Sequence, residues 1–227
     1  MNLRKFKTQG DFEDFLRDFQ RTESESEYSV EVTGNIDLRN KPWIKRLPSK
    51  LTVFGDFNLT GCFERGQLPG LLQVSGFLSL RDCSKATTLP QKLVVGGSLC
   101  LAGCTGLTHL PKKGIGVMDN LDMNGCSGLK NLPSKLHIRG YLDLSGCSSL
   151  TNLPETLKVG TDLWIEKCIQ IKSVPDGLRV GGSLYLTDCK EISSLPEDIR
   201  VGGNIWLAGT SISDKISLRG VVGWSFF

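Results

Sequence analysis

Apolar residues recur at fixed positions along the chain, in a unit of 21 residues that is repeated from one end to the other. The unit reads Leu-Pro-x-x-Leu-x-Val-x-Gly-x-Leu-x-Leu-x-x-Cys-x-x-Leu-x-x, and clear copies begin at Leu47, Leu68, Leu89, Leu110, Leu132, Leu153, Val174 and Leu195. A weaker copy precedes Leu47, and a fragment from Ile216 to Phe227 follows the last one. Self-similarity at a period of roughly 20 to 50 residues predicts a solenoid or another repeat architecture.

Each unit contains a stretch of alternating apolar positions, as in Leu178-Arg-Val180-Gly-Gly182-Ser-Leu184-Tyr-Leu186. Alternation with a period of two predicts one strand with one buried face. One strand in each repeat leaves no room for a hairpin, so we expect successive strands to lie parallel and each coil to bury its leucines against its neighbours. The Leu-Pro step favours an extended or 3₁₀-like return. The glycine of the unit predicts a tight bend or a close approach between coils.

The phrase Leu-x-Leu-x-x-Cys-x-x-Leu-x-x-Leu-Pro resembles the leucine-rich repeat family, in which asparagine or cysteine holds the seat occupied here by Cys62 to Cys189. The short unit with Leu-Pro-x-x-Leu is similar to repeats of bacterial effector proteins, which usually carry asparagine at that seat. The Gly-Cys-x-x-Leu-x-x-Leu-Pro phrase also resembles repeats of plant immune receptors. The resemblance implies an α/β-solenoid, a parallel β-strand leucine-rich-repeat horseshoe with about 9 coils of 21 residues and an N-terminal helical cap.

The first residues depart from the repeat and predict a cap, because a bare terminal coil exposes its core. Four apolar residues keep the spacing of an amphipathic helix: Phe12, Phe15, Leu16 and Phe19. We expect this helix over residues 11–21, with Asp11 as its N-cap. A spacer rich in Ser and Glu, residues 22–27, follows it.

The domain organisation follows from these patterns: an N-terminal helical cap (1–25), a leucine-rich repeat solenoid (26–214) and a C-terminal partial repeat or cap (215–227). The last residues include Trp224 and Phe227 and are strongly apolar. Either they cover the last coil or the natural chain continues beyond them.

Seven of the eight cysteines follow the period of the repeat: Cys62, Cys83, Cys104, Cys126, Cys147, Cys168 and Cys189. The resemblance implies that they point into the solenoid and bond to the backbone, with Thr210 keeping a small donor in the last copy. Neighbouring seats in a parallel stack have the wrong mutual orientation for a disulfide, and no Cys-x-x-Cys spacing suggests zinc. Free thiols indicate a reducing, cytoplasmic compartment. Cys100 is the exception, since we expect it on the outward side of its strand.

Charge excludes some partners. The 27 Lys and Arg against 24 Asp and Glu leave a net charge of +3 in 227 residues. A nucleic-acid-binding protein usually shows a clear basic excess, so we expect no nucleic-acid partner, although a local basic patch stays open. No apolar run reaches the ~18–20 residues that span a bilayer, and we expect no membrane partner. No apolar stretch follows the first charged residues, which disfavours a cleaved signal peptide.

The outward positions between the two strand leucines predict a working surface on the concave face of the horseshoe. Coil by coil they are Asp37, Asn58, Ser79, Cys100, Asp122, Asp143, Trp164, Tyr185 and Trp206. Neighbouring strands would place the last three rings about 5 Å apart in one stripe. Tyr141 and Phe77 would widen the patch, and acidic residues flank it: Asp122, Asp143, Asp162 and Glu166. Cross-strand packing alone, or coverage by a terminal segment, is the alternative reason for the stripe.

The function predicted from these features is a non-catalytic, monomeric module that recognises a partner protein through Trp164, Tyr185, Trp206, Tyr141 and the acidic flank. No phosphate loop, Ser-His-Asp arrangement or zinc spacing points to an enzyme, a cofactor or a metal. The effector resemblance implies a protein that acts on a host cell after non-Sec secretion. Two alternatives stay open: the substrate-recognition part of a larger ubiquitin-ligase-type effector, and a carbohydrate-binding solenoid.

Overall fold

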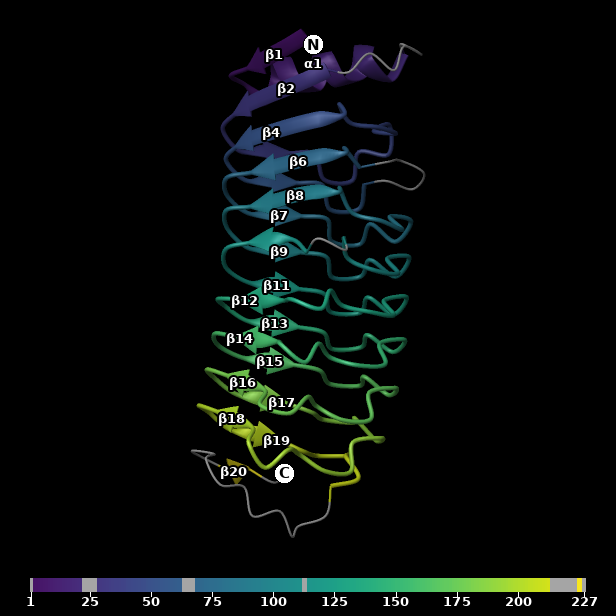
Figure 1. Ribbon diagram of the computed structural model, residues 1–227. Helices are drawn as coiled ribbons and strands as arrows, with labels where there is room; N and C mark the ends of the chain where they lie inside the picture. The colour runs from purple at the N-terminus through teal and green to yellow at the C-terminus, as the bar shows by residue number, and fades with distance from the viewer. Residues whose placement is uncertain (1, 22–27, 63–67, 112–113, 213–223, 226–227) are drawn as a thin grey trace.

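A computed structural model describes residues 2–21, 28–62, 68–111, 114–212 and 224–225. They form a parallel β-solenoid whose coils stack along one axis (Figure 1). The register confirms the predicted coil length, since Leu142 pairs with Leu163 and Leu163 pairs with Leu184. The predicted parallel stacking of the repeat is therefore confirmed.

Each coil contains two short strands, where the sequence pattern predicted one. The first strands are β2 (Tyr28–Thr33), β4 (Lys50–Phe54), β6 (Leu71–Val74), β8 (Lys92–Val95), β10 (Gly116–Val117), β12 (His137–Ile138), β14 (Lys158–Val159), β16 (Arg179–Val180) and β18 (Arg200–Val201). The second strands are β3 (Ile36–Asp37), β5 (Phe57–Asn58), β7 (Leu78–Ser79), β9 (Leu99–Cys100), β11 (Leu121–Asp122), β13 (Leu142–Asp143), β15 (Leu163–Trp164), β17 (Leu184–Tyr185) and β19 (Ile205–Trp206). The two sets run in opposite directions across the coil (Figure 1).

The strands assemble into two layers. The first strands form the sheets β1-β2-β4-β6-β8-β10 and β12-β14-β16-β18, and the second strands form one sheet that ends on β20 (Trp224–Ser225). The interruption between β10 and β12 lies beside the coil that carries one extra residue, between Pro111 and Cys126. The buried leucines, isoleucines and valines of both layers form a single core cluster, so the layers pack against each other through their inner faces.

The glycine of the repeat makes the bend between the two strands. The glycine of the unit is, for example, Gly97, and a Cβ atom on it would lie 3.0 Å from the carbonyl group of Gly76 in the preceding coil. In later coils the residue before that position is glycine as well, and a Cβ atom on Gly181 would meet the carbonyl oxygen of Gly160. The bend therefore requires a close approach of neighbouring backbones, as predicted. Apolar alternation continues through the bend, and this is why the pattern looked like one strand.

The described coils do not contain the helices that an α/β horseshoe implies. The described residues contain one helix, α1 (Gln9–Arg21), and the coils return from the second strand to the next first strand through turns. The N-terminal end is β1 (Asn2–Phe6) followed by α1, and β1 pairs in parallel with β2. The strand β1 was not predicted.

The helix α1 lies at the N-terminal end of the stack (Figure 1) and buries Phe12, Leu16 and Phe19. It starts two residues before the predicted Asp11, and Thr8 rather than Asp11 caps it, since the Thr8 Oγ1 accepts the Asp11 N–H at 3.1 Å. Gln9 exchanges hydrogen bonds with the backbone of Asp37, its Nε2 donating to the carbonyl at 2.8 Å and its Oε1 accepting the N–H at 3.0 Å. The Gln9 amide thereby takes the place of a neighbouring strand beside β3, which is the edge strand of the second-strand sheet.

The division into three segments at residues 25 and 214 stays a prediction. The spacer 22–27 and most of the C-terminal segment 215–227 lie outside the described residues, except for β20. This short strand pairs in parallel with β19, through Ile205–Trp224 and Trp206–Ser225.

The seven periodic cysteines form a buried ladder. Each Sγ donates to the carbonyl oxygen of a residue in the preceding coil, at distances between 2.8 Å (Cys189 to Ile165) and 3.4 Å (Cys147 to Met123). The remaining bonds join Cys62 to Leu38, Cys83 to Leu59, Cys104 to Leu80, Cys126 to Leu101 and Cys168 to Leu144. All eight cysteines are free thiols. Thr210 keeps a donor at the last seat, but its hydroxyl bonds to Leu207 of its own coil at 2.8 Å.

Candidate interaction surface

The predicted outward residues lie in one row on the second-strand sheet. Each pairs in register with its equivalent in the next coil, from Asp37 opposite Asn58 to Tyr185 opposite Trp206. The row is therefore confirmed, on a sheet face rather than on the inside of a horseshoe. We call this surface the second-strand face.

Four aromatic rings form a continuous stack on the second-strand face. The Trp164 and Tyr185 rings lie 5.0 Å apart with an interplanar angle of 10°, and those of Tyr185 and Trp206 lie 5.9 Å apart at 4°. Tyr141 meets Trp164 edge-on, at 5.6 Å and 87°. The parallel rings of Trp164, Tyr185 and Trp206 face one another, so the stack presents ring edges along its length.

The four rings are partly exposed, whereas the leucines beside them in the same strands are buried. Burial raises the pKa of the Tyr141 phenol, and the carboxylates of Asp122 and Asp143 raise it further. The phenol is therefore an uncharged hydrogen-bonding group at neutral pH. Phe77, which was expected to widen the patch, lies three coils away on the bend before β7 and is exposed.

The acidic residues of the predicted site have different roles. Asp162 accepts the N–H of Ser183 at 2.6 Å and so holds the bend of the next coil. Asp122 and Asp143 each accept a backbone N–H two residues further on, from Asn124 at 3.0 Å and Ser145 at 2.8 Å. These bonds use one oxygen of each carboxylate and fix its direction.

Of the carboxylates, those nearest the stack are Asp143 and Glu166. Asp143 pairs directly with Trp164 across the neighbouring strands. Glu166 lies two residues after Trp164 in the same coil and is partly exposed. The end of the stack toward Tyr141 is therefore bordered by negative charge, as predicted.

Cys100 lies on the outward side of its strand as expected, in register with Ser79 and Asp122, but it is buried there. It is 8% exposed, and its Sγ donates to the Asp122 Oδ2 at 3.4 Å. Burial is the largest cause that raises the pKa of Cys100 to about 11, and the Asp122 carboxylate adds to it. A thiol held in this uncharged form is a poor nucleophile at neutral pH.

A second group of surface residues was missed by the sequence analysis. The first strands β12, β14, β16 and β18 present His137, Lys158, Arg179 and Arg200 outward, all exposed and in register. The signal was present in the variable position of Leu-x-Val, which is basic in four consecutive units. A single strand in each coil would place that position and the aromatic position on the same face. The separation of the two groups onto different faces was therefore not expected.

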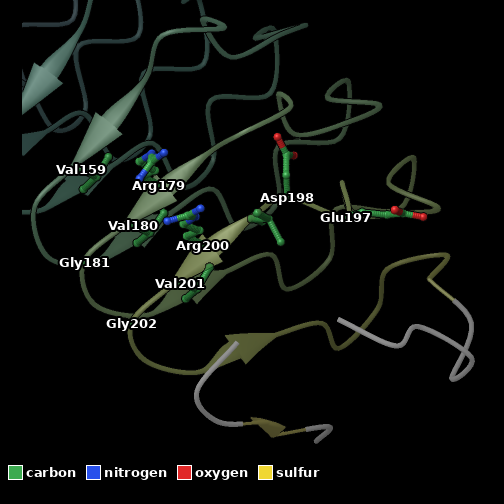
Figure 2. Close-up of a pocket in the computed structure, with 10 residues that line it drawn as sticks. Val159, Arg179, Val180, Gly181, Glu197, Asp198, Arg200, Val201 and Gly202 are labelled. Atoms are coloured by element: carbon green, nitrogen blue, oxygen red, sulfur yellow. The ribbon is translucent and has the colours of Figure 1, made fainter. Parts of the chain in front are cut away.

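A groove lies on the first strands of the last coils, lined by residues of β14, β16 and β18. It has a volume of about 750 Å³. Figure 2 shows Arg179 and Arg200 side by side on adjacent strands, with Glu197 and Asp198 where β18 begins. The described part of the chain holds no group of three or more His, Cys, Asp or Glu side chains able to bind a metal ion.

Comparisons with protein-family models, with curated proteins and with solved structures find no match for this chain. Among the described residues, no helix has the length and apolar character that crossing a membrane requires. The class that the fold itself defines is a parallel β-solenoid with a buried cysteine ladder.

Proposed function

We propose that this protein is a non-catalytic module that binds a partner protein through the second-strand face. The observation that carries the proposal is the stack of Tyr141, Trp164, Tyr185 and Trp206, whose edges are partly exposed. Trp and Tyr are the residues most enriched at the centres of protein interfaces. A rim of carboxylates at one end favours a partner segment that carries Lys or Arg.

The stacking geometry favours a protein over a carbohydrate. Sugars bind by laying their apolar side on the open face of an aromatic ring, whereas both faces of Tyr185 are turned toward other rings, with centroid distances of 5.0 Å to Trp164 and 5.9 Å to Trp206. Ring edges and the Tyr hydroxyl instead suit backbone carbonyls and side-chain acceptors of a polypeptide. A carbohydrate-binding solenoid is therefore the weaker alternative.

The affiliation to leucine-rich repeats is part of the proposal. It rests on the Leu-x-Leu-x-x-Cys phrase and is supported by the inward, backbone-bonded cysteines. A ladder of free thiols supports a reducing, cytoplasmic setting, including that of a host cell reached by non-Sec secretion. The second candidate, the substrate-recognition part of a ubiquitin-ligase-type effector, requires a catalytic domain encoded beyond Phe227, which the reading frame of the gene decides.

The test is a photo-crosslinking experiment. Replacing Tyr185 with the aromatic crosslinker p-benzoylphenylalanine keeps a ring in the stack and should trap one discrete partner in cells. The matched control places the same crosslinker at Val94, an outward and exposed position of the opposite face. Equal products at both positions, or none at Tyr185, would contradict the proposal.

A second measurement separates binding from folding. The triple change Trp164→Ala, Tyr185→Ala and Trp206→Ala should abolish recovery of the trapped partner while the circular dichroism spectrum is kept. Phe54→Ala with Met118→Ala, both on the opposite face, should leave recovery unchanged. A blank glycan array would dismiss the carbohydrate alternative.

A further inference from the structure

The outward side of the first-strand sheets, which we call the first-strand face, carries a row of basic side chains. Its exposed Lys and Arg side chains lie within or directly beside the strands: Lys92, Lys135, Arg139, Lys158, Arg179 and Arg200. Acidic residues lie mainly at the corners before the strands, where these side chains are exposed: Glu155, Asp176, Glu197 and Asp198. Glu31 is paired with Lys5 at 2.9 Å, and Asp198 accepts the N–H of Gly177 at 2.8 Å. The strands themselves thus present cations, whereas most of the acidic side chains lie at the corner beside them.

The centre of this row is a ladder of four aligned residues. His137 pairs with Lys158, Lys158 with Arg179 and Arg179 with Arg200, at strand spacings of about 4.8 Å. None of the four makes an ion pair with a described residue. Like charges directly opposite each other destabilise a sheet, so the ladder is not explained by folding.

The same outward position holds no cation in earlier coils, where Glu31, Thr52, Gln73, Val94 and Gly116 occupy it in register. The fold therefore does not require a cation there. Acidic residues occur at the corner before the last first strands, and Figure 2 shows Glu197 and Asp198 at that end of the groove, away from the guanidinium groups. They border the ladder without neutralising it.

Exposed apolar side chains occupy the rest of the first-strand face. Four of the six large apolar residues that the described chain exposes lie on it: Leu3 (49% exposed), Phe54 (51%), Val94 (41%) and Met118 (46%). They come from β1, β4, β8 and the residue after β10, so they are spread over the coils that precede the ladder. The face thus combines scattered apolar side chains at one end with cations at the other.

We propose that the first-strand face binds the surface of a bilayer that contains anionic phospholipids. Cations next to such a surface are attracted by its negative potential, and apolar side chains gain by burial at the boundary between headgroups and acyl chains. This inference departs from the expectation of no membrane partner, and it does not depend on the proposed protein-binding role.

The apolar residues of the face favour a bilayer over a nucleic acid. Gly160, Gly181 and Gly202 follow the ladder strands and leave the sheet surface without side chains there. Of the four exposed apolar residues only Phe54 has a ring that can stack on a base, whereas Leu3, Val94 and Met118 are suited to insertion among lipid headgroups. Bilayer binding would leave the aromatic stack on the opposite side of the coil.

The test is cosedimentation with vesicles. Vesicles of phosphatidylcholine with 30% phosphatidylserine should bind the protein, binding should fall as salt rises from 50 to 300 mM, and vesicles of phosphatidylcholine alone should bind far less. The triple change Lys158→Gln, Arg179→Gln and Arg200→Gln should weaken binding roughly 100-fold, because each cation near an anionic surface contributes about fivefold. Phe54→Ser with Met118→Ser should weaken it several-fold.

The matched control removes the same charge from the return side of the coils, by Lys85→Gln, Lys130→Gln and Lys172→Gln, all exposed. These changes should leave vesicle binding within about twofold, since the removed charges lie away from the proposed contact. Equal losses in both triple variants, or equal binding to uncharged vesicles, would overturn the proposal. So would tight binding of a 20-nucleotide RNA together with no sedimentation on anionic vesicles.

Discussion

The two faces of the solenoid are built on one core and have opposite surface chemistry. The second-strand face carries a stack of aromatic rings bordered by Asp122, Asp143 and Glu166, whereas the first-strand face carries a cationic ladder and isolated apolar side chains. Rings in adjacent strands stabilise each other, while aligned cations repel. Coils with the same backbone can therefore carry a row of side chains that stabilises the fold on one face and a row that destabilises it on the other. A row that destabilises the fold is the stronger indication of a binding partner, because folding does not explain it.

The core that both faces share should lose stability at alkaline pH, and both faces should then unfold together. Burial raises the pKa of the ladder thiols, to about 12 for Cys104 and Cys168, from an ordinary value of 9.0. The native state therefore holds protons that the unfolded state releases, and stability is full below pH 9 and falls as pH rises toward 12. At pH 10 each thiol whose pKa lies near 12 costs about 1.4 kcal/mol relative to pH 7, so the ladder together costs several kcal/mol, a large part of the stability of a domain.

Unfolding by guanidinium between pH 7 and 10, under reducing conditions, measures this effect. Replacing Cys126 and Cys147 by alanine lowers stability at pH 7 but should reduce the loss between pH 7 and 10 by about a quarter, since two of eight thiols no longer titrate. A free energy of unfolding that stays constant from pH 7 to 10 would show that the thiols do not control it.

The bend that separates the faces should be the next most sensitive point. Gly181→Ala places a methyl group against the carbonyl of Gly160 and should lower the free energy of unfolding by about 2–4 kcal/mol. Gly116→Ala is the control, because the nearest atom to its Cβ would be 3.7 Å away, an ordinary contact. Thermal unfolding of both variants should separate them clearly; similar midpoints would mean that the coils shift to accept the methyl group.

The aromatic face should contribute to stability as well as to binding. Tyr185→Ala removes the central ring and its contacts at 5.0 and 5.9 Å, and should cost about 2 kcal/mol. Val94→Ala, an outward residue of the opposite face that is 41% exposed, should cost less than about 0.5 kcal/mol. If chemical denaturation gave equal losses in the free energy of unfolding for the two variants, the aromatic stack would not contribute to the stability of the fold.

The smallest expected effect has opposite signs on the two faces. Arg179→Gln relieves repulsion within the ladder and should raise stability by about 0.3–0.5 kcal/mol at low salt, with no gain at 0.5 M salt. Arg39→Gln on the other face breaks the ion pair with Asp37, whose Nη2–Oδ2 distance is 2.7 Å, and should lower stability slightly at low salt. Destabilisation by Arg179→Gln would show that the ladder is structural.

Much of the fold was predictable from the repeat, because each position of the unit has one environment in every coil. The buried leucines and the alignment of Trp164, Tyr185 and Trp206 followed from the period, and the inward direction of the cysteines followed from the resemblance to leucine-rich repeats. The boundary of α1 and the strand β1 were not predicted, since neither belongs to the repeat and each is held by contacts with distant residues. The Gln9 amide on the backbone of Asp37 is such a contact.

The candidate site was predictable in its membership but only partly in its roles. The row from Asp122 to Trp206 was correctly grouped, yet Asp162 supports the bend through Ser183, and Cys100 is buried rather than exposed. Both outcomes depend on a neighbouring coil: Asp162 bonds to an N–H in the next coil, and Cys100 bonds to Asp122 there. A pattern within one repeat does not contain these contacts.

The sequence by itself determined the 21-residue period, the parallel stacking and which positions face inward, because alternation and a fixed period leave one way to bury the leucines. The tertiary structure decided that the alternating stretch bends at its glycine and divides into two sheets. Alternation distinguishes inside from outside but does not say on which face an outward residue lies. The close approach of neighbouring backbones at Gly160, Gly181 and Gly202 makes that division, and it places the aromatic stack and the cationic ladder on different faces.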